Sequence, residues 1–198
     1  LISQSLPVDV VDSENNKIMG IKAIVAGSGH TIALKNDGTL LAWGGNGNGQ
    51  LGDGTELNRS FPTVVKDVDN QPISGVRAIF AKNRHSFAIK ADGSVLAWGF
   101  WDGTKEDNDR TYNSIIPREL LDSSGNRIIG IKAIDDHFAI DSNDNLLILG
   151  RFFGDRLITT AIANDSFGMP VTGIKAIESG LFLKESGELL TGGGGKIS

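Results

Sequence analysis

A five-residue phrase that occurs four times in the chain constrains the fold more than any other feature of the sequence. The phrase reads GIKAI three times and GVRAI once, and it begins, at intervals of 55, 55 and 43 residues, at Gly20, Gly75, Gly130 and Gly173. A proline stands 13 residues before each of the first three glycines. The chain is therefore an array of copied structural units. Such units bury their apolar faces against their neighbours, and the surface that remains normally binds a partner.

Each unit contains short strand-like segments separated by Gly, Asn and Asp. In the first unit these segments read IKAIVAG, HTIALKND, TLLAWGG and PTVVKDV, and each has the length of a strand. The middle two are joined by Asp37-Gly38, and the second unit has Asp92-Gly93 in the same place. Such dipeptides favour a tight hairpin turn. The matching turns are Asn143-Asp144-Asn145 in the third unit and Ser186-Gly187 in the fourth.

No segment keeps the 3.6-residue period of a helix. Four-stranded units of about 40–55 residues therefore predict an all-β β-propeller, in which each unit is one blade around a common axis.

The stretch from Gly29 to Thr55, GHTIALKNDGTLLAWGGNGNGQLGDGT, resembles the repeat of the regulator of chromosome condensation family. The resemblance rests on the Gly-x-His-Thr, Asp-Gly, Trp-Gly and Gly-Gln-Leu-Gly elements of that stretch. The second unit keeps His85 and Trp98-Gly99 but replaces the Gln-Leu-Gly loop by FWDGTKEDN, and the third keeps His137 and Ala139. The resemblance covers nearly all of the chain, and it implies the same propeller fold.

Family members usually have seven blades, whereas this chain has material for about four. We expect one propeller domain over residues 1–198, with repeats at 20–74, 75–129 and 130–172. The last repeat is then 173–198, completed by residues 1–19. Pairing of the two ends would close a small ring, and the alternative is that the chain is part of a seven-bladed array.

The charge and composition exclude several kinds of partner. A net charge of −5 gives no overall attraction to a phosphate backbone or an anionic membrane, so neither nucleic acid nor a membrane is expected as a partner. The chain has no cysteine, and hence no disulfide and no cysteine-ligated zinc. A cysteine-free chain is compatible with a cytoplasm, either that of the producing cell or that of a host cell into which the protein is delivered. No metal and no cofactor is expected.

Three histidines invite a catalytic or metal-binding interpretation, but they recur at matching places in successive units. His30 and His85 are 55 residues apart, and His137 lies near the matching point of the third unit. We therefore predict hydrogen-bonding structural roles for them. Trp43 and Trp98 repeat in the same way, and together with Phe61 they are predicted to pack between blades. The segment GNGQLG, from Gly47 to Gly52, fits a dinucleotide-binding fingerprint letter by letter. That fingerprint needs a helix after it, and no helical pattern follows, so the segment is read as a loop between strands.

Large side chains interrupt the repeat at one loop position, where the first unit has only Gly45-Asn46-Gly47. Equivalent loops of a propeller line the same rim, and aromatic and arginine side chains are enriched at protein-binding hot spots. The predicted partner-binding residues are Phe100, Trp101, Arg110, Tyr112, Arg151, Phe152 and Phe153. The alternative is that these side chains only fill space left by the lost glycine loop.

The leading functional prediction is a protein-protein interaction propeller without catalytic residues of its own. The resemblance implies more, since the founding member of the family is a guanine nucleotide exchange factor for the small GTPase Ran, and short versions resemble effectors of intracellular bacteria. We therefore expect a small GTPase, Ran or a relative, as the partner, and exchange activity or simple GTPase binding as the function. The alternative is a non-catalytic scaffold or inhibitor domain of a larger protein.

Overall fold

The computed structural model describes residues 6–101, 112–122, 124–135, 137–149, 151–153, 156–158, 162–165, 167–193 and 196–197. These residues form strands, turns and connecting segments, and the strands belong to four sheets. The first sheet, called the first blade, has the order β1-β2-β3-β4, with β1 (Ile21–Ala26), β2 (His30–Lys35), β3 (Leu40–Gly44) and β4 (Arg59–Val64).

The second sheet has six strands in the order β12-β13-β8-β7-β6-β5. The second blade is its part made of β5 (Val76–Lys82), β6 (His85–Lys90), β7 (Val95–Trp101) and β8 (Tyr112–Leu121). The two short strands β12 (Arg151–Phe153) and β13 (Arg156–Ile158) extend this sheet beyond β8. β13 pairs with β8 in parallel, so a segment that follows the third blade in sequence is added to the sheet of the second blade.

The third and last blades complete the arrangement. The third blade has the order β11-β10-β9, with β9 (Ile131–Asp135), β10 (Phe138–Asp141) and β11 (Leu146–Ile148). The last blade has the order β14-β15-β16-β17, with β14 (Ile174–Glu178), β15 (Leu181–Lys184), β16 (Leu189–Gly193) and β17 (Lys196–Ile197). Each repeated phrase forms the beginning of a blade's first strand, so the predicted all-β propeller of blade units is confirmed.

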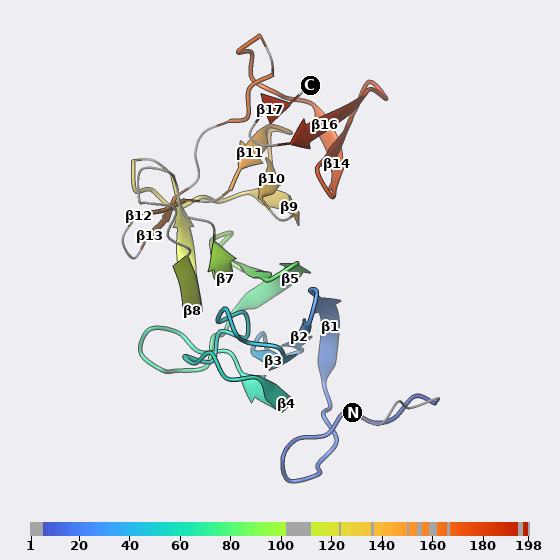
Figure 1. Cartoon of the computed structure of the whole chain (residues 1–198), viewed down its shortest axis with the longest axis vertical. Coiled ribbons are helices and arrows are strands. Elements are labelled where there is room, and N and C mark those ends of the chain that lie inside the picture. Colours follow the sequence, from blue (N-terminus) through green and yellow to red (C-terminus); the bar gives the residue numbers. More distant parts are fainter. Residues whose placement is uncertain are drawn as a thin grey trace.

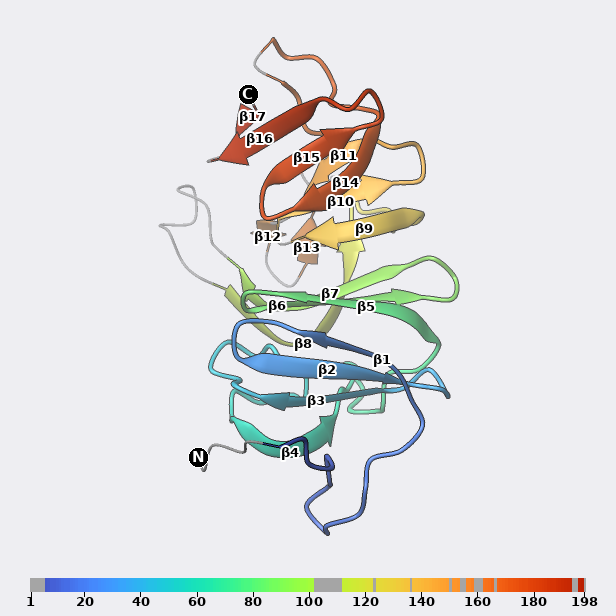
Figure 2. The ribbon, with the colours of Figure 1, turned by 90° about the vertical axis from the view of Figure 1, so that its right-hand side faces the viewer.

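The blades lie one above another, from the first at one end of the molecule to the last at the other (Figure 2). Both views place the chain before β1 beside the first blade, and β17 with the last blade at the other end (Figure 1, Figure 2). The strand that pairs with β16 is β17, not the segment at residues 6–19. Residues 6–19 and the last blade lie at opposite ends of the stack (Figure 2), and the expected completion of residues 173–198 by residues 1–19 stays a prediction.

The predicted hairpin turns occur in all four blades, with a shared geometry. In the first blade the Gly38 N–H donates to the Lys35 carbonyl at 3.0 Å, and the matching bond in the second blade runs from Gly93 to Lys90, also at 3.0 Å. Only the second residue of each Asp-Gly pair is left-handed, with φ of 82° at Gly38 and 86° at Gly93. The third blade uses Asp144 at that position, with φ of 62°. Asn and Asp tolerate this conformation better than other side chains.

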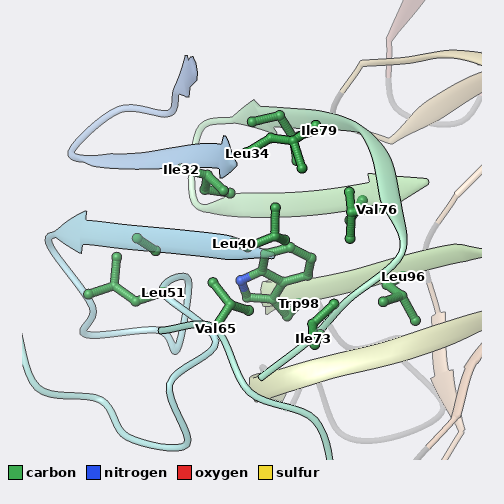
Figure 3. Close-up of a cluster of buried hydrophobic side chains, with 12 residues drawn as sticks. Ile32, Leu34, Leu40, Leu51, Val65, Ile73, Val76, Ile79, Leu96 and Trp98 are labelled. Atoms are coloured by element: carbon green, nitrogen blue, oxygen red, sulfur yellow. The ribbon is translucent and has the colours of Figure 1, made fainter. Parts of the chain in front are cut away.

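The core consists of three apolar clusters, one at each junction between consecutive blades. Trp98 is fully buried in the first cluster, where it lies near Leu40, Val65 and Ile73 (Figure 3). Its repeat equivalent Trp43 is only half-buried. The prediction of a packing role between blades is therefore confirmed for Trp98 and wrong for Phe61, which is 46% exposed on β4. Phe61 lies on β4, an edge strand of the first sheet.

Candidate partner-binding rim

The strands of each blade end at two different edges of the molecule. One edge carries the tight hairpins described above. The other carries the β5–β6 turn at Asn83 and Arg84, the long loop 45–58 between β3 and β4, and the beginning of β8. We call this second edge, over the first two blades, the loop rim. The Ser28 N–H donates to the Asn83 carbonyl at 2.8 Å and thereby joins the two blades there.

A buried asparagine holds the loop between β3 and β4 in one conformation. Asn46 is fully buried, and its Nδ2 donates to the carbonyl oxygens of Thr55 at 2.9 Å and Leu57 at 3.1 Å. Its Oδ1 accepts from the Leu51 N–H at 2.9 Å, and its own N–H donates to Asn58 Oδ1 at 2.7 Å. The Asn46 side chain therefore satisfies backbone groups in the middle and near the end of the loop, and the Asn58 side chain satisfies one at its start, which makes the loop rigid.

A partly buried ion pair reinforces the same loop. Asp53 is buried, and its Oδ2 accepts from both Nε and Nη2 of Arg59 at 2.7 Å. Burial of the Asp53 carboxyl favours its neutral form, but hydrogen bonds from Thr55 and Arg59 outweigh this effect and lower its pKa. Asp53 is therefore charged at neutral pH, and it fixes Arg59 at the start of β4.

The loop also forms the junction with the second blade. The Gln50 carbonyl accepts from Trp98 Nε1 at 2.9 Å and from Ser86 Oγ at 2.7 Å. Since the Ser86 hydroxyl has donated its one proton, it accepts from His30 Nε2 at 2.9 Å, which assigns the proton of the neutral imidazole to Nε2. Burial lowers the pKa of His30 to about 4. The predicted structural hydrogen-bonding role of His30 is therefore confirmed.

The other two histidines lie farther along the same line of blades. The rings of His85 and His137 are 5.1 Å apart and nearly perpendicular. Burial, followed by the charges of His137 and His30, lowers the pKa of His85 to about 3, so this ring is neutral at physiological pH. Over the described residues, no group of three or more His, Asp or Glu side chains is arranged to hold a metal ion.

The structure brings some of the predicted partner-binding residues together at the loop rim. The Phe100 ring is half-buried, lies 6.2 Å from the His85 ring, and has the Arg84 guanidinium 5.5 Å from its centre. The backbones of Trp101 and Tyr112 pair directly across β7 and β8. Arg110 lies in the segment 102–111, outside the described residues.

The other predicted residues are on a different part of the same sheet. Arg151, Phe152 and Phe153 form β12, which pairs with β13, and β13 pairs with β8 at Leu120 and Leu121. Leu120 follows Glu119, which pairs with Leu96 on β7. Leu96 and Trp101 are five residues apart on β7, and five residues of a strand span about 17 Å. The strand register therefore separates this group from Phe100, Trp101 and Tyr112.

Sequence reasoning missed several polar and apolar residues of the loop rim. Asn48 donates through Nδ2 to Asn113 Oδ1 at 3.2 Å, and Asn113 donates in turn to Glu56 Oε1 at 3.0 Å. Leu57 is 63% exposed near the end of the loop, two residues before β4 begins. An apolar residue between Glu56 and Asn58, in an otherwise polar loop, was the available signal for Leu57.

The first strands of the second, third and last blades enclose a small charged site. Lys82 Nζ lies 2.5 Å from Glu178 Oε1, 3.2 Å from Asp135 Oδ1 and 3.0 Å from Ser179 Oγ. The Glu178 hydrogen bond is the main reason that the pKa of Lys82 is raised, and the same bond lowers the pKa of Glu178. The adjoining cavity has a volume of about 190 Å³. The acids and the lysine there are paired with one another, so the cluster ties the three blades together.

A larger cavity of about 420 Å³ lies between the segment 67–74, which joins the first two blades, and the second blade, with Ile73, Lys90, Pro117 and Arg118 in its wall. Its walls contain both acidic and basic side chains. Among the described elements there is also no helix long and apolar enough to cross a membrane.

Comparisons with known proteins agree with the architecture. The family models of the regulator of chromosome condensation (RCC1) repeat match residues 21–50 and 37–89. The ultraviolet-B receptor UVR8 of Arabidopsis thaliana is 34% identical to this chain over 119 residues, which cover 58% of this chain and 26% of the receptor.

Two solved structures have a similar fold over most of the chain. Human WBSCR16 superposes with a TM-score of 0.57 at 16% identity, over 88% of this chain and 49% of that one. Prp20p of Saccharomyces cerevisiae, whose structure was described together with its binding to Gsp1p and histones, gives a TM-score of 0.56 at 20% identity. The likeness covers 86% of this chain and 43% of Prp20p. The chain thus spans a quarter of the matched receptor and about half of the matched solved propellers.

Proposed function

We propose that this chain, which is a regulator of chromosome condensation repeat protein, binds a protein partner through its loop rim and that the partner is a small GTPase. The observation that carries the proposal is the hydrogen-bonded loop 45–58, which exposes Leu57. Glu56 of this loop is bonded to Asn113, the strand partner of Phe100, and the Phe100 ring lies under the Arg84 guanidinium. A preorganised loop loses little conformational entropy on binding, and apolar, aromatic and arginine side chains contribute most to protein interfaces.

The choice of a GTPase is supported by the resemblance to the family's founding member and by the binding of Gsp1p reported for Prp20p. Nucleotide exchange requires a protein surface that binds the GTPase better without its nucleotide than with it, and it needs no catalytic triad. A rim that combines exposed Leu57 with the cation of Arg84 offers apolar contact and an attraction for acidic residues of the partner. In this proposal Trp101 and Tyr112 extend the rim, whereas β12 is a separate surface.

The direct experiment measures release of a fluorescent guanine nucleotide from a panel of small GTPases in the presence of the purified chain. We expect binding of one GTPase and faster release of its nucleotide. Leu57→Asp should weaken this binding at least about tenfold, because a charge would be buried without a partner. Phe100→Ala should also weaken it.

The chain offers a matched control for Leu57→Asp. Ile129 is also 63% exposed but precedes the third blade, near the tight turn at Gly93. Ile129→Asp should therefore leave GTPase binding unchanged. Equal losses for both variants, or no binding to any GTPase, would contradict the proposal. Binding that leaves nucleotide release unchanged would instead favour the second candidate, a scaffold or inhibitor module, for which the same loop rim is the binding surface.

A further inference from the structure

Every junction between blades joins the same two kinds of blade face. The onward face, directed at the next blade in sequence, includes the residue pair that flanks the tight hairpin. In the first blade this pair is Leu34 and Leu40, which are directly paired and 1% and 0% exposed. In the second blade it is Ile89 and Val95, both 1% exposed. The third blade has Ile140 and Leu146 there, which are also buried.

The onward face of the last blade has the same residues in the same register but no covering blade among the described residues. Leu183 and Leu189 are directly paired beside the hairpin, and Leu189 is 63% exposed. Leu181, which occupies the position of the fully buried Ile32, is 46% exposed. Leu181, Leu183 and Leu189 share one face, at positions that are buried or partly buried in the other blades, so this face is an unfinished junction and not a finished outer surface.

The backward face of a blade is the one directed at the preceding blade. In the first blade, at the other end of the stack, no blade covers this face among the described residues. Ile79 pairs with Ala88 in the second blade and is 6% exposed, whereas Ile24 pairs with Ala33 in the first blade and is 62% exposed. Trp43, the equivalent of the fully buried Trp98, is half-buried on the same face. The described segment before β1 does not cover this face, since Val8 is itself 66% exposed.

We propose that a second copy of this chain covers both faces, so that the first blade of each copy packs on the last blade of the other. The occupant follows from continuity with the internal junctions. An onward face of Leu, Ile or Val packs on a backward face of Ile with Trp, Leu or Phe throughout the stack, and each copy has one uncovered face of each kind among the described residues. Contacts between unlike faces are head-to-tail, and two such contacts related by a two-fold axis close a ring.

The size of the chain agrees with this assembly. Two copies contribute eight sheets, which is within the range of about four to eight blades found in propellers. The inference does not use the loop rim and holds whether or not the proposed GTPase binding is correct.

The experiment measures the mass of the chain in solution by light scattering after size exclusion, over a range of concentrations. The expected species is a dimer with twice the 21.0 kDa mass of the chain. Leu189→Asp and Ile24→Asp each place an unpaired charge in both junctions of the dimer. Each variant alone should therefore weaken dimerisation at least about tenfold. Both side chains are exposed in one copy, so both variants should keep the thermal unfolding temperature of the isolated chain.

A mixture of the two variants provides the decisive test of the head-to-tail arrangement. In a head-to-tail dimer of one Leu189→Asp chain with one Ile24→Asp chain, one junction contains both aspartates and the other contains none. The mixture should therefore recover dimers that neither variant forms alone, and Ile129→Asp should dimerise normally. A wild-type chain that remains monomeric at every concentration would overturn the proposal. So would a mixture as monomeric as its components, or an Ile24→Asp variant that dimerises like wild type.

Discussion

Individual polar side chains in this protein act mainly as connectors between blades. Ser86 shows this best, because its single hydroxyl joins His30 of the first blade to the Gln50 carbonyl of the loop and is itself fully buried. A side chain with two buried partners cannot be removed without leaving a donor or acceptor unsatisfied.

Ser86→Ala should therefore lower the free energy of unfolding by about 1–3 kcal/mol, since it leaves the His30 Nε2–H and one acceptor site at Gln50 unpaired. The measurement is urea-induced unfolding followed by tryptophan fluorescence. The matched control is Ser124→Ala, an exposed serine in the turn after β8, which should change stability by less than about 0.5 kcal/mol. Similar effects of the two substitutions would show that the hydroxyl of Ser86 does not connect the blades.

The buried histidines should make the protein sensitive to mild acid. Burial lowers the folded pKa of His30 to about 4, below its ordinary value of 6.5. The unfolded chain therefore binds more protons, and stability present above pH 6.5 is lost as the pH falls from 6.5 towards 4. His30→Gln replaces the ring by a neutral amide and should reduce this loss. Unfolding free energies at pH 7 and pH 4.5 measure the difference, and an unchanged pH dependence in the variant would contradict the assignment.

At the scale of elements, the tight hairpins recur because each blade has a residue that adopts a left-handed conformation at the same position of the turn. The left-handed residue is Gly38, Gly93, Asp144 or Gly187 in successive blades. The sequence predicts these turns directly, but an Asp-Gly pair by itself suggests two left-handed residues, as in a two-residue hairpin loop. In the structure the Asp37 carboxylate instead accepts from the Thr39 N–H at 3.0 Å and from its hydroxyl at 2.6 Å. These bonds leave only the glycine left-handed.

Gly38→Ala should destabilise the protein by about 1–2 kcal/mol through its positive φ alone. A Cβ there would also lie 3.2 Å from the Gly75 nitrogen of the next blade. Gly187→Ala has a similar φ of 87° and open space around the new methyl group, so it isolates the backbone strain and should cost less. Thermal unfolding of both variants checks the order. A larger effect at Gly187 would rule out contact with the next blade as a cause.

For the whole molecule, stability is divided among junctions because neighbouring blades provide the packing. Phe182 is fully buried at the last junction, where its ring is 4.8 Å from that of Phe138. In such linear arrays each unit is stabilised by its neighbours and opens with some independence from distant units.

Phe182→Ala should cost about 3–5 kcal/mol at the last junction. We expect hydrogen exchange to show faster exchange in β14–β16 while β1–β4 keep their protection. The comparison variant is Ile32→Ala, which opens the first junction instead and should leave the last blade protected. Uniform loss of protection along the chain in both variants would show that the four blades unfold as one cooperative unit.

Much of this fold could be predicted from the sequence, because strands and turns depend on neighbouring residues. The repeated phrase, the Asp-Gly turns and the Trp-Gly elements predict blades and their order, and the recurrence of His30 and His85 predicts buried structural roles. The rim was harder to predict. The role of Asn46 depends on partners up to 12 residues away, and the separation of β12 from Trp101 depends on a strand that joins the sheet of the preceding blade.

The sequence by itself determined the repeated unit, since strand length, turn chemistry and the spacing of apolar residues are local properties. Only the tertiary structure decided which of these equivalent residues are covered. Trp43 and Trp98 occupy the same place in their blades, yet one is half-buried and the other fully buried. Burial depends on the blade that lies against a face, and the residues of the face itself do not record whether that blade is present.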